Sequence, residues 1–318
     1  MAEFLTIGEP LVVFAANDVD VPLAQVSSFS RFLAGAELNV AVGVSRLGHS
    51  SAYISEVGQD FFGEFIRTEV ATQNISNQYL WLSDTYQTGF YFKEAVSQGD
   101  PQIQYYRKGS AASHLTKEKL AQLDLSDTKL VHCSGIFPAL SPETLTTMNA
   151  FMDQLQVEGI TTTFDPNLRP SLWNSQAEMV TTLNELAKKA KIILPGISEG
   201  EILMGSRDPE DIADFYLGQS DYTEAVIVKL GADGAYVKQR GAVGYVIPGF
   251  KVAHVVDTVG AGDGFAVGVI TALLEGKDLA EGARRGCAVG ALAIQSASDN
   301  GGYPTPAELA EFYQVNAE

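Results

Sequence analysis

VDTVGAGDGF, residues 256–265, leads from a glycine-rich loop directly into an apolar helix. Glycines at such a junction let successive backbone N–H groups point toward one spot, where the helix dipole adds positive potential. The stretch therefore predicts an anion-binding site at Gly260, Ala261 and Gly262, with donors that favour the ionised, proton-accepting form of Asp263. A carboxylate base beside such a hole is what a hydroxyl needs to attack a phosphoryl group. The alternative is an Asp that only caps a glycine-rich helix start.

On both sides of this stretch, short β-branched runs alternate with longer amphipathic runs. The expected strands cover residues 4–8, 51–55, 129–134, 160–164, 191–195 and 225–230. The expected helices cover residues 36–47, 60–72, 141–157 and 175–189. Ser141 and Pro142 form an N-cap and first-turn pattern, and Gly48 is placed as a C-terminal stop. This alternation predicts the α/β class, with a mostly parallel sheet covered on both faces.

Two stretches interrupt the alternation, residues 10–34 and residues 78–107. The second is predicted to form successive strands, with turns near Ser83-Asp84 and Gly99-Asp100-Pro101. Strands without crossover helices predict a small separate antiparallel sheet, a lid contributed by about 10–34 and 85–110 within one domain spanning 1–318. Its apolar side chains need cover from a ligand or from a second copy of the chain, which predicts a homodimer through the lid. They are Trp81, Phe90, Phe92 and Val96.

Composition narrows the classes of function. The chain has 318 residues, with 39 Asp and Glu against 21 Lys and Arg and a net charge of −18. An acidic surface repels phosphate backbones and anionic lipids, so neither nucleic acid nor membrane is an expected partner. An anionic substrate would require a local reversal of sign, by a metal, arginines or helix N-termini. Cys133 and Cys287 are expected to be buried thiols, and the absence of a signal-peptide pattern predicts a cytoplasmic protein.

Residues 256–265 resemble the C-terminal motif of the ribokinase-like (PfkB) carbohydrate kinases, Asp-Thr-x-Gly-Ala-Gly-Asp-x-Phe. The N-terminal counterparts are AGAELNVA at 34–41, RLG at 46–48, GQD at 58–60 and FG at 62–63. The resemblance extends from residue 4 to about residue 310, and Ala34 departs from it where the family usually has a second glycine. It implies a ribokinase-like three-layer sandwich and an ATP-dependent kinase that uses Mg²⁺. In such a kinase Asp263 would be the base, and the amides of 260–263 would bind the transferred phosphate.

The nucleotide side also has counterparts in the family. KLGADG at 229–234 resembles the segment that meets the ATP phosphates and ribose, which implies ATP-binding roles for Lys229, Gly231 and Gly234. A hairpin turn is the simpler interpretation of this segment, and both can hold. The family's Asn-x-x-Glu element, which holds water around Mg²⁺, corresponds to 196–199. Glu199 is kept there, while Gly196 stands at the Asn position.

Three features resemble the 2-keto-3-deoxygluconate kinases within this family. They are GAELN at 35–39, the apolar Val13 where many sugar kinases have an Asp, and the pair YYRKGSA at 105–111 and DPNLR at 165–169. The implied reaction is phosphorylation of the terminal hydroxyl of that sugar acid. The residues implied to hold it are Gly35, Asn39, Tyr91, Tyr105, Arg107 and Arg169.

The chemistry of the two arginines is consistent with a sugar-acid substrate, because a guanidinium pairs bidentately with a carboxylate. Arg107 and Arg169 would supply the reversal of sign, and tyrosine hydroxyls would add hydrogen bonds. Without the family motifs, a solvated edge strand and ordinary packing would explain the same residues.

Other functions stay open at this point. A fructokinase or another neutral-sugar kinase would share Asp263 but would not need the two arginines. A sugar sensor would bind ligand without releasing ADP. GISEG at 196–200 also matches Gly-x-Ser-x-Gly, with His254 downstream, so a serine hydrolase acting through Ser198 is a further alternative.

Overall fold

A ten-stranded sheet forms the centre of the molecule in the computed structural model, which describes residues 2–99, 101–252, 254–296 and 298–316. Its strands are β1 (Phe4–Ile7), β4 (Ser51–Gly58), β5 (Ile75–Ser76), β6 (Leu80–Ser83), β9 (Leu130–Ser134), β10 (Thr161–Asp165), β11 (Ile192–Ile193), β12 (Ala225–Lys229), β13 (Gly234–Gln239) and β14 (Tyr245–Pro248). The order is β14-β13-β12-β11-β10-β9-β1-β4-β5, with β6 also paired to β4. All pairs are parallel except those that add β13 and β14 at one edge.

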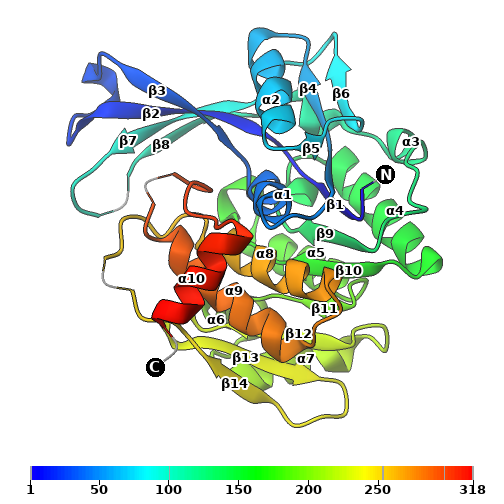
Figure 1. Cartoon of the computed structure of the whole chain (residues 1–318). Coiled ribbons are helices and arrows are strands. Elements are labelled where there is room, and N and C mark those ends of the chain that lie inside the picture. The colour runs from blue at the N-terminus through cyan, green and yellow to red at the C-terminus, as the bar shows by residue number, and fades with distance from the viewer. Residues whose placement is uncertain (1, 100, 253, 297, 317–318) are drawn as a thin grey trace.

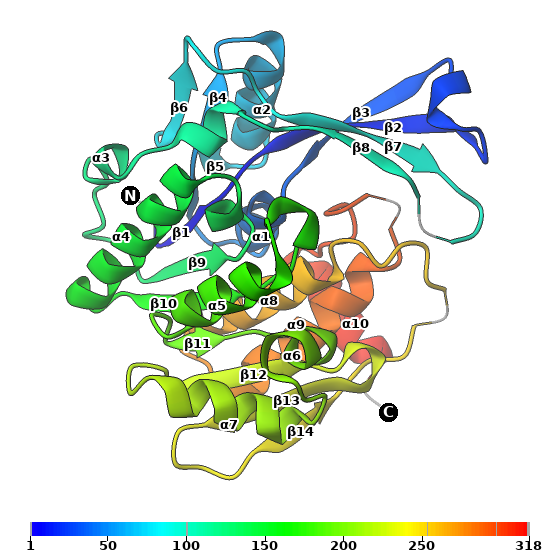
Figure 2. The same ribbon diagram turned by 180° about the vertical axis from the view of Figure 1, so that it is seen from behind.

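Helices cover both faces of this sheet, as Figures 1 and 2 show from opposite sides. One layer consists of α1 (Ala36–Arg46), α2 (Phe61–Thr72), α8 (Ala261–Leu274), α9 (Leu279–Ala293) and α10 (Pro306–Val315). The other consists of α3 (Lys117–Leu120), α4 (Pro142–Glu158), α5 (Gln176–Ala187), α6 (Ile197–Met204) and α7 (Pro209–Gln219). Short 3₁₀ turns occupy Leu23–Gln25, Ala111–His114, Phe137–Ala139, Pro170–Leu172 and Gly231–Asp233. The predicted three-layer α/β sandwich with a mostly parallel sheet is confirmed.

Local sequence signals explain where the helices begin and end. The Ser141 hydroxyl accepts the backbone N–H of Thr144 at 3.1 Å and starts α4, as predicted. Gly159 ends that helix at φ 72°, a left-handed conformation in which a Cβ is unfavourable. Asp60 caps α2 by accepting from Phe62 and Gly63 at 3.0 and 2.8 Å. These caps satisfy donors that the first helical turn leaves without an intrahelical partner.

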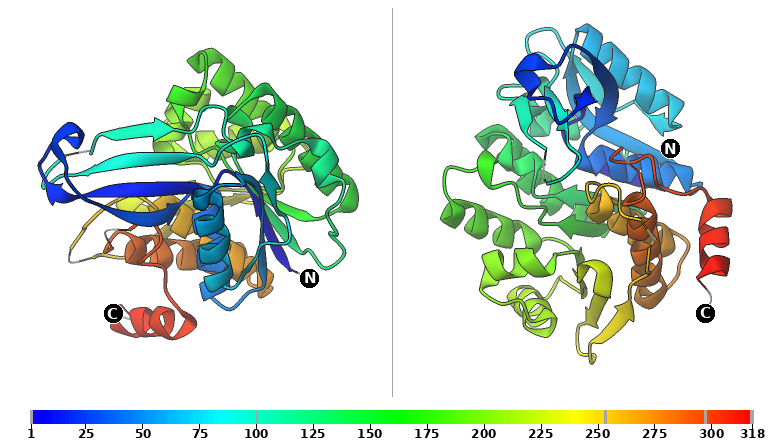
Figure 3. Two further views of the ribbon diagram at one scale, coloured as in Figure 1. Left: turned by 90° about the horizontal axis from the view of Figure 1, so that it is seen from above. Right: turned by 90° about the vertical axis from the view of Figure 1, so that its left-hand side faces the viewer.

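A second, four-stranded sheet forms the lid and extends away from the body (Figure 3). Its order is β3-β2-β7-β8, from β2 (Leu11–Val19), β3 (Phe29–Ala34), β7 (Phe90–Ala95) and β8 (Ile103–Tyr106). The prediction that it is antiparallel is wrong for the central pair, because β2 and β7 run parallel. The prediction is also wrong for residues 80–83, which pair with β4 in the main sheet and take Trp81 with them. Asp100 of the predicted 99–101 turn lies outside the described residues.

Two simpler features complete the description. Cys133 and Cys287 are free and buried, as predicted. Within the described ranges, the structure contains no helix long and apolar enough to cross a membrane.

Candidate active site

A cavity of about 440 Å³ lies where the lid meets the carboxyl end of the parallel strands. Open parallel sheets usually bind ligands at this end of their strands. The cavity wall includes all the residues predicted to hold the sugar, together with the predicted base. They are Gly35, Asn39, Tyr91, Tyr105, Arg107, Arg169 and Asp263. The structure therefore brings together side chains that are scattered over more than 200 positions of sequence.

A second cavity of about 690 Å³ adjoins the first and is lined mainly by apolar and glycine residues. It includes Gly231 and Gly234, which were predicted to bind ATP, and the α8 residues Ala261 and Phe265. Lys229, Thr258 and Gly262 line both cavities. Both volumes fall within the range of small-molecule sites, about 300–1,000 Å³. Two ligands bound in these cavities would meet at the start of α8.

The start of α8 has the backbone geometry that an anion site requires. Gly260 has φ 81°, and a Cβ there would lie 2.0 Å from the carbonyl oxygen of Asp299, so only glycine fits. Gly260 acts as the N-cap, and Ala261 and Gly262 begin the first turn, whose N–H groups lack intrahelical acceptors. The Ala261 N–H reaches the Thr258 carbonyl at a long 3.4 Å. The positive end of α8 thus faces the junction of the two cavities.

Asp263 lies in this first turn and accepts a hydrogen bond from Asn39 Nδ2 at its Oδ2, at 2.9 Å. Burial raises the pKa of Asp263 to about 7, although the Asn39 donor opposes the shift. The sequence predicted that donors would favour the ionised form, and the opposite shift results because desolvation outweighs one hydrogen bond. A carboxyl with a pKa near 7 is well matched to taking a proton at neutral pH.

Lys229 extends into the site from the end of β12. Its Nζ lies 2.6 Å from Asp165 Oδ2 and 4.0 Å from Glu199 Oε2. Burial alone would lower the pKa of this ammonium, but Asp165 and Glu199 raise it above its ordinary value. In the sequence, Asp165 stood out only as the first residue of DPNLR at 165–169, and no motif indicated that it pairs with Lys229.

Glu199, predicted to hold water around Mg²⁺, also begins α6. Its carboxylate accepts the N–H of Gly196 at 2.6 Å and of Leu168 at 3.0 Å. Burial raises its pKa, and Lys229 acts in the opposite direction. In the described part of the chain, no three His, Cys, Asp or Glu side chains are grouped so as to hold a metal by themselves. This arrangement fits Mg²⁺, which commonly keeps several waters and is held by one or two carboxylates and the substrate phosphates.

The two arginines of the sugar cavity differ in their surroundings. Arg107 pairs with the buried carboxylate of Glu9, with Nε at 2.6 Å from Oε2, and Ser110 donates to the other oxygen. Arg169 is exposed and donates to the Leu168 carbonyl at 2.9 Å; it forms no ion pair with any residue that the structure describes. Arg169 is therefore the stronger source of uncompensated positive charge. Glu9 was missed, because nothing in its local sequence indicates its partner.

Contacts also join the lid to the loop before α8. Lys93 Nζ of β7 lies 3.0 Å from Asp257 Oδ2, in the glycine-rich stretch 256–265. Burial raises the pKa of Asp299, and a hydrogen bond with Tyr91 acts against that shift.

The apolar residue of β2 that lines the sugar cavity is Leu11 rather than Val13, and Val13 packs beside Tyr91 in the lid. An apolar residue does face the sugar cavity, two positions before the predicted one.

The serine-hydrolase alternative lacks its required geometry. Ser198 lies in the first turn of α6, and it is not among the described non-glycine residues with positive φ. His254 is exposed in the loop that precedes α8. A strained strand-to-helix turn that presents the serine, as in nucleophile elbows, is therefore missing from the described residues.

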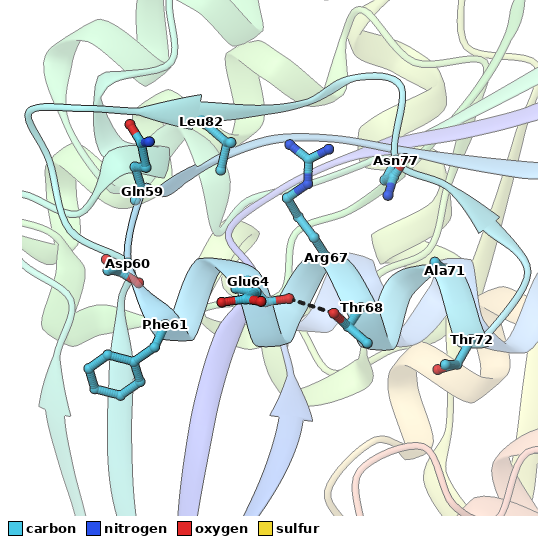
Figure 4. A pocket seen from close by; sticks show the side chains of 11 residues that line it. Gln59, Asp60, Phe61, Glu64, Arg67, Thr68, Ala71, Thr72, Asn77 and Leu82 are labelled. Atoms are coloured by element: carbon cyan, nitrogen blue, oxygen red, sulfur yellow. Dashed lines mark hydrogen bonds between the residues drawn. The ribbon is translucent and has the colours of Figure 1, made fainter.

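A third hollow of about 900 Å³ lies between α2 and the segment around β6 (Figure 4). Its lining includes Asp60, Phe61, Arg67 and Leu82, and none of the residues predicted for the site. Asp60 is already used as the cap of α2. This hollow is separate from the two cavities that meet at α8.

Comparison with known proteins agrees with this geometry. The family model "pfkB family carbohydrate kinase" matches residues 1–306. The chain belongs to this family of carbohydrate kinases. A 2-dehydro-3-deoxygluconokinase of Bacillus subtilis is 44% identical over 309 residues, which cover 97% of this chain and 94% of that protein. The predicted family, and with it a phosphotransferase activity on carbohydrates, is confirmed.

Solved structures of the family superpose closely. A PfkB protein from Polaromonas has a TM-score of 0.88 at 39% identity, covering 98% of this chain and 99% of that one. A protein from E. coli in complex with ATP and Mg²⁺ has a TM-score of 0.88 at 25% identity, covering 99% of this chain and all of that one. Relatives in this family thus bind ATP with Mg²⁺.

Proposed function

We propose that this kinase transfers the γ-phosphoryl group of ATP to the terminal hydroxyl of 2-keto-3-deoxygluconate, also named 2-dehydro-3-deoxygluconate. One observation carries the proposal: Asp263 lines the sugar cavity in the first turn of α8, directly after Gly262, which lines both cavities. The Bacillus subtilis relative named for this sugar acid supports the choice of substrate.

In the proposed mechanism, Asp263 takes the proton from the sugar hydroxyl as the hydroxyl oxygen attacks the γ-phosphorus. The bond from that phosphorus to the β–γ bridging oxygen breaks, and ADP leaves. The amides of Gly260, Ala261 and Gly262 stabilise charge on the phosphoryl oxygens, helped by the dipole of α8. Lys229, in the wall shared by the cavities, adds a fixed positive charge at the same point. Mg²⁺, when bound, neutralises the nucleotide phosphates, and Asp165 and Glu199 are the residues that would hold its water.

Binding of the sugar acid is assigned to the lid and to the loop after β10. Arg169 pairs with the carboxylate, and Arg107, oriented by Glu9, adds a second donor. Tyr91 and Tyr105 form a cross-strand pair above the cavity, with ring centroids 5.1 Å apart, and their hydroxyls complete the contacts. Gly35 allows the substrate to approach the backbone. Closure of the lid then excludes water, which would otherwise accept the phosphoryl group.

The nucleotide is assigned to the apolar cavity. Gly231 and Gly234 lie in the tight connection between β12 and β13, the hairpin that the sequence also predicted. Gly234 has φ 106°, and a Cβ there would lie 2.0 Å from the Ile247 carbonyl oxygen. A side chain at Gly234 would therefore displace the adjoining segment that forms the cavity wall.

A neutral-sugar kinase is the second candidate, and one observation favours it. Because Glu9 compensates Arg107, the cavity is less cationic than the two arginines suggest. An assay of ADP release with 2-keto-3-deoxygluconate, fructose and ribose separates the candidates, with ³¹P and ¹³C NMR to locate the phosphate. We expect a product phosphorylated at the terminal carbon of the keto-deoxy acid. Turnover of fructose or ribose alone would support the second candidate and refute the first.

We also propose that lid and body work as one kinase domain, and that a second copy of the chain covers the outer lid surface. Tyr106 lies on the lid face opposite Tyr105 and the sugar cavity, where it is exposed and stacks on Phe90 with ring centroids 5.0 Å apart. Light scattering should give twice the chain mass, and Tyr106→Glu should reduce it to the mass of a single chain. A single-chain mass for the unaltered protein would refute the dimer. Because the enzyme depends on ATP, we propose a cytoplasmic location.

A further inference from the structure

Behind the start of α8 lies the segment 298–303, which no motif identified. Asn300 Nδ2 donates to Asn39 Oδ1 at 2.9 Å. Asn39 in turn donates from Nδ2 to Asp263 Oδ2, also at 2.9 Å. Asn39 is 2% exposed, so these bonds are shielded from competing water. Two side-chain amides in series thus end on the carboxylate assigned as the base.

The segment that carries Asn300 is fixed to α1 and to the start of α8. Arg46 Nη1 donates to the Asn300 carbonyl at 2.6 Å. The Tyr303 hydroxyl donates to the Gly260 carbonyl at 2.8 Å, and Asp299 packs against Gly260 so closely that a Cβ there has no room. The segment is therefore fixed to the first turn of α8 at several points, and the Asn300 amide has a defined position.

The direction of the Asn39 amide follows from its two partners. An ionised carboxylate only accepts hydrogen bonds, so the NH₂ end of Asn39 must face Asp263. The hydrogen bond from Asn300 requires the same orientation, because Asn300 Nδ2 donates to the Asn39 side-chain oxygen. With the amide reversed, two oxygens would face each other at Asp263 and two NH₂ groups would face each other at Asn300.

We propose that Asn300 is a positioning residue for the phosphoryl transfer: it orients the Asn39 amide, which restrains one carboxylate oxygen of Asp263 and leaves the other to take the proton. This inference rests on the proposed function, in which Asp263 is the base. Asn39, predicted as a sugar contact, has both ends of its amide engaged within the protein. Its main task is therefore to hold the base.

Several charged and titratable groups around Asp263 also influence its pKa. They are Glu37 of α1, Asp165 of β10, Arg169 in the loop that follows it, Lys229 of β12, and Tyr303. None of them is altered when Asn300 is replaced. A donated hydrogen bond lowers the pKa of a carboxyl, so weakening the Asn39 bond should raise the pKa of Asp263.

The test compares Asn300→Ala with Ser298→Ala, a substitution in the same segment. Among the described residues, the Ser298 hydroxyl hydrogen-bonds to Ser296 and not to Asn39 or Asp263. We expect Asn300→Ala to lower kcat about tenfold, with KM for ATP unchanged, and to move the acidic limb of kcat/KM up by about one pH unit. Asn300→Leu, which fills the same volume without a donor, should do the same. Ser298→Ala should leave both quantities unchanged. A limb that moves no further in Asn300→Ala and Asn300→Leu than in Ser298→Ala overturns the proposal.

Two further measurements separate this proposal from the proposed function. A ¹³C NMR titration of the Asp263 carboxyl needs no substrate, and its midpoint should rise in Asn300→Ala whichever sugar is phosphorylated. In an Asn39→Ala background, Asn300→Ala should have no additional effect on that midpoint. An equal additional effect there would show that Asn300 does not act through Asn39.

Discussion

The ammonium group of Lys229 lies 2.6 Å from the carboxylate of Asp165, in the wall shared by the two cavities. The ammonium also lies 3.8 Å from the position that a Cβ on Gly262 would take, which places it at the N-terminus of α8. A positive charge held there by a buried carboxylate is in place before the phosphoryl group arrives. Such a preorganised charge favours the transition state because it requires no reorganisation during the reaction.

Lys229→Met should therefore lower kcat by about 10²-fold, the size expected when one group that stabilises transition-state charge is lost. Asp165 and Glu199 would then face the phosphates without their cation, so KM for ATP should also rise. Steady-state kinetics measures both. Lys188→Met is the matched control, since the ion-pair partner of Lys188 within the described ranges is Glu185, at the surface end of α5 and away from both cavities. An unchanged kcat in Lys229→Met would remove Lys229 from the mechanism.

Asp263→Asn should lower kcat by about 10²–10⁴-fold, as expected for the loss of a general base. Binding of ATP should persist, and calorimetric titration with a nonhydrolysable analogue measures it. Because burial penalises the ionised carboxylate, the neutral amide should also raise Tm at pH 8. A variant that turns over at the original rate would contradict the role of Asp263.

The pH profile follows from the raised pKa of Asp263. The base must be deprotonated to act, so kcat/KM should be lost as pH falls through about 7. Stability should change in the opposite direction: a folded-state pKa above the unfolded value favours folding at low pH, and that contribution is lost as pH rises through about 7. Kinetics and thermal melts from pH 5 to pH 9 test both trends. A profile that stays flat from pH 5 to pH 9 would exclude Asp263 as the titrating base.

The two arginines should respond differently to substitution. Arg169→Ala should raise KM for the sugar acid by about tenfold or more, while leaving the fold intact, because Arg169 is exposed and unpaired among the described residues. Arg107→Ala should also lower the free energy of unfolding, by about 3–5 kcal/mol, because it leaves the Glu9 carboxylate buried without its partner.

Removing the unpaired carboxylate provides the control for Arg107. In the double variant Arg107→Ala with Glu9→Gln, Tm should recover while KM for the acid stays high. If Tm does not recover, the loss of stability has another cause. An equal rise of KM for a neutral ketohexose in Arg169→Ala would contradict its pairing with the carboxylate.

Much of the body follows from local sequence. The α4 helix begins at Ser141 and ends at Gly159 because a side-chain cap and a left-handed glycine are local features. The lid was harder to predict, since strand direction in β2 and β7 depends on how distant segments meet. Residues 80–83 have strand character in either sheet, and only their pairing with β4 decides between them.

The candidate site likewise contains residues that local sequence predicts and residues that only the fold brings together. Gly260 and Asp263 are visible because their chemistry lies within one turn of sequence. Asp165 with Lys229 and Asn300 with Asn39 are pairs between remote segments, and neither partner has a local pattern that indicates the other. The sign of the Asp263 pKa shift was missed for a related reason: the number of donors can be guessed from a loop, whereas burial depends on the whole fold.

The most direct test of the central claim offers 2-keto-3-deoxygluconate and fructose together, with ATP and Mg²⁺, to the unaltered enzyme. The phosphorylated products are then identified by mass and by ³¹P NMR. We predict that phosphate accumulates on the terminal carbon of the keto-deoxy acid, with one ADP released for each, before fructose is consumed. Fructose phosphate as the main product, or ADP release with free phosphate alone, would contradict the account.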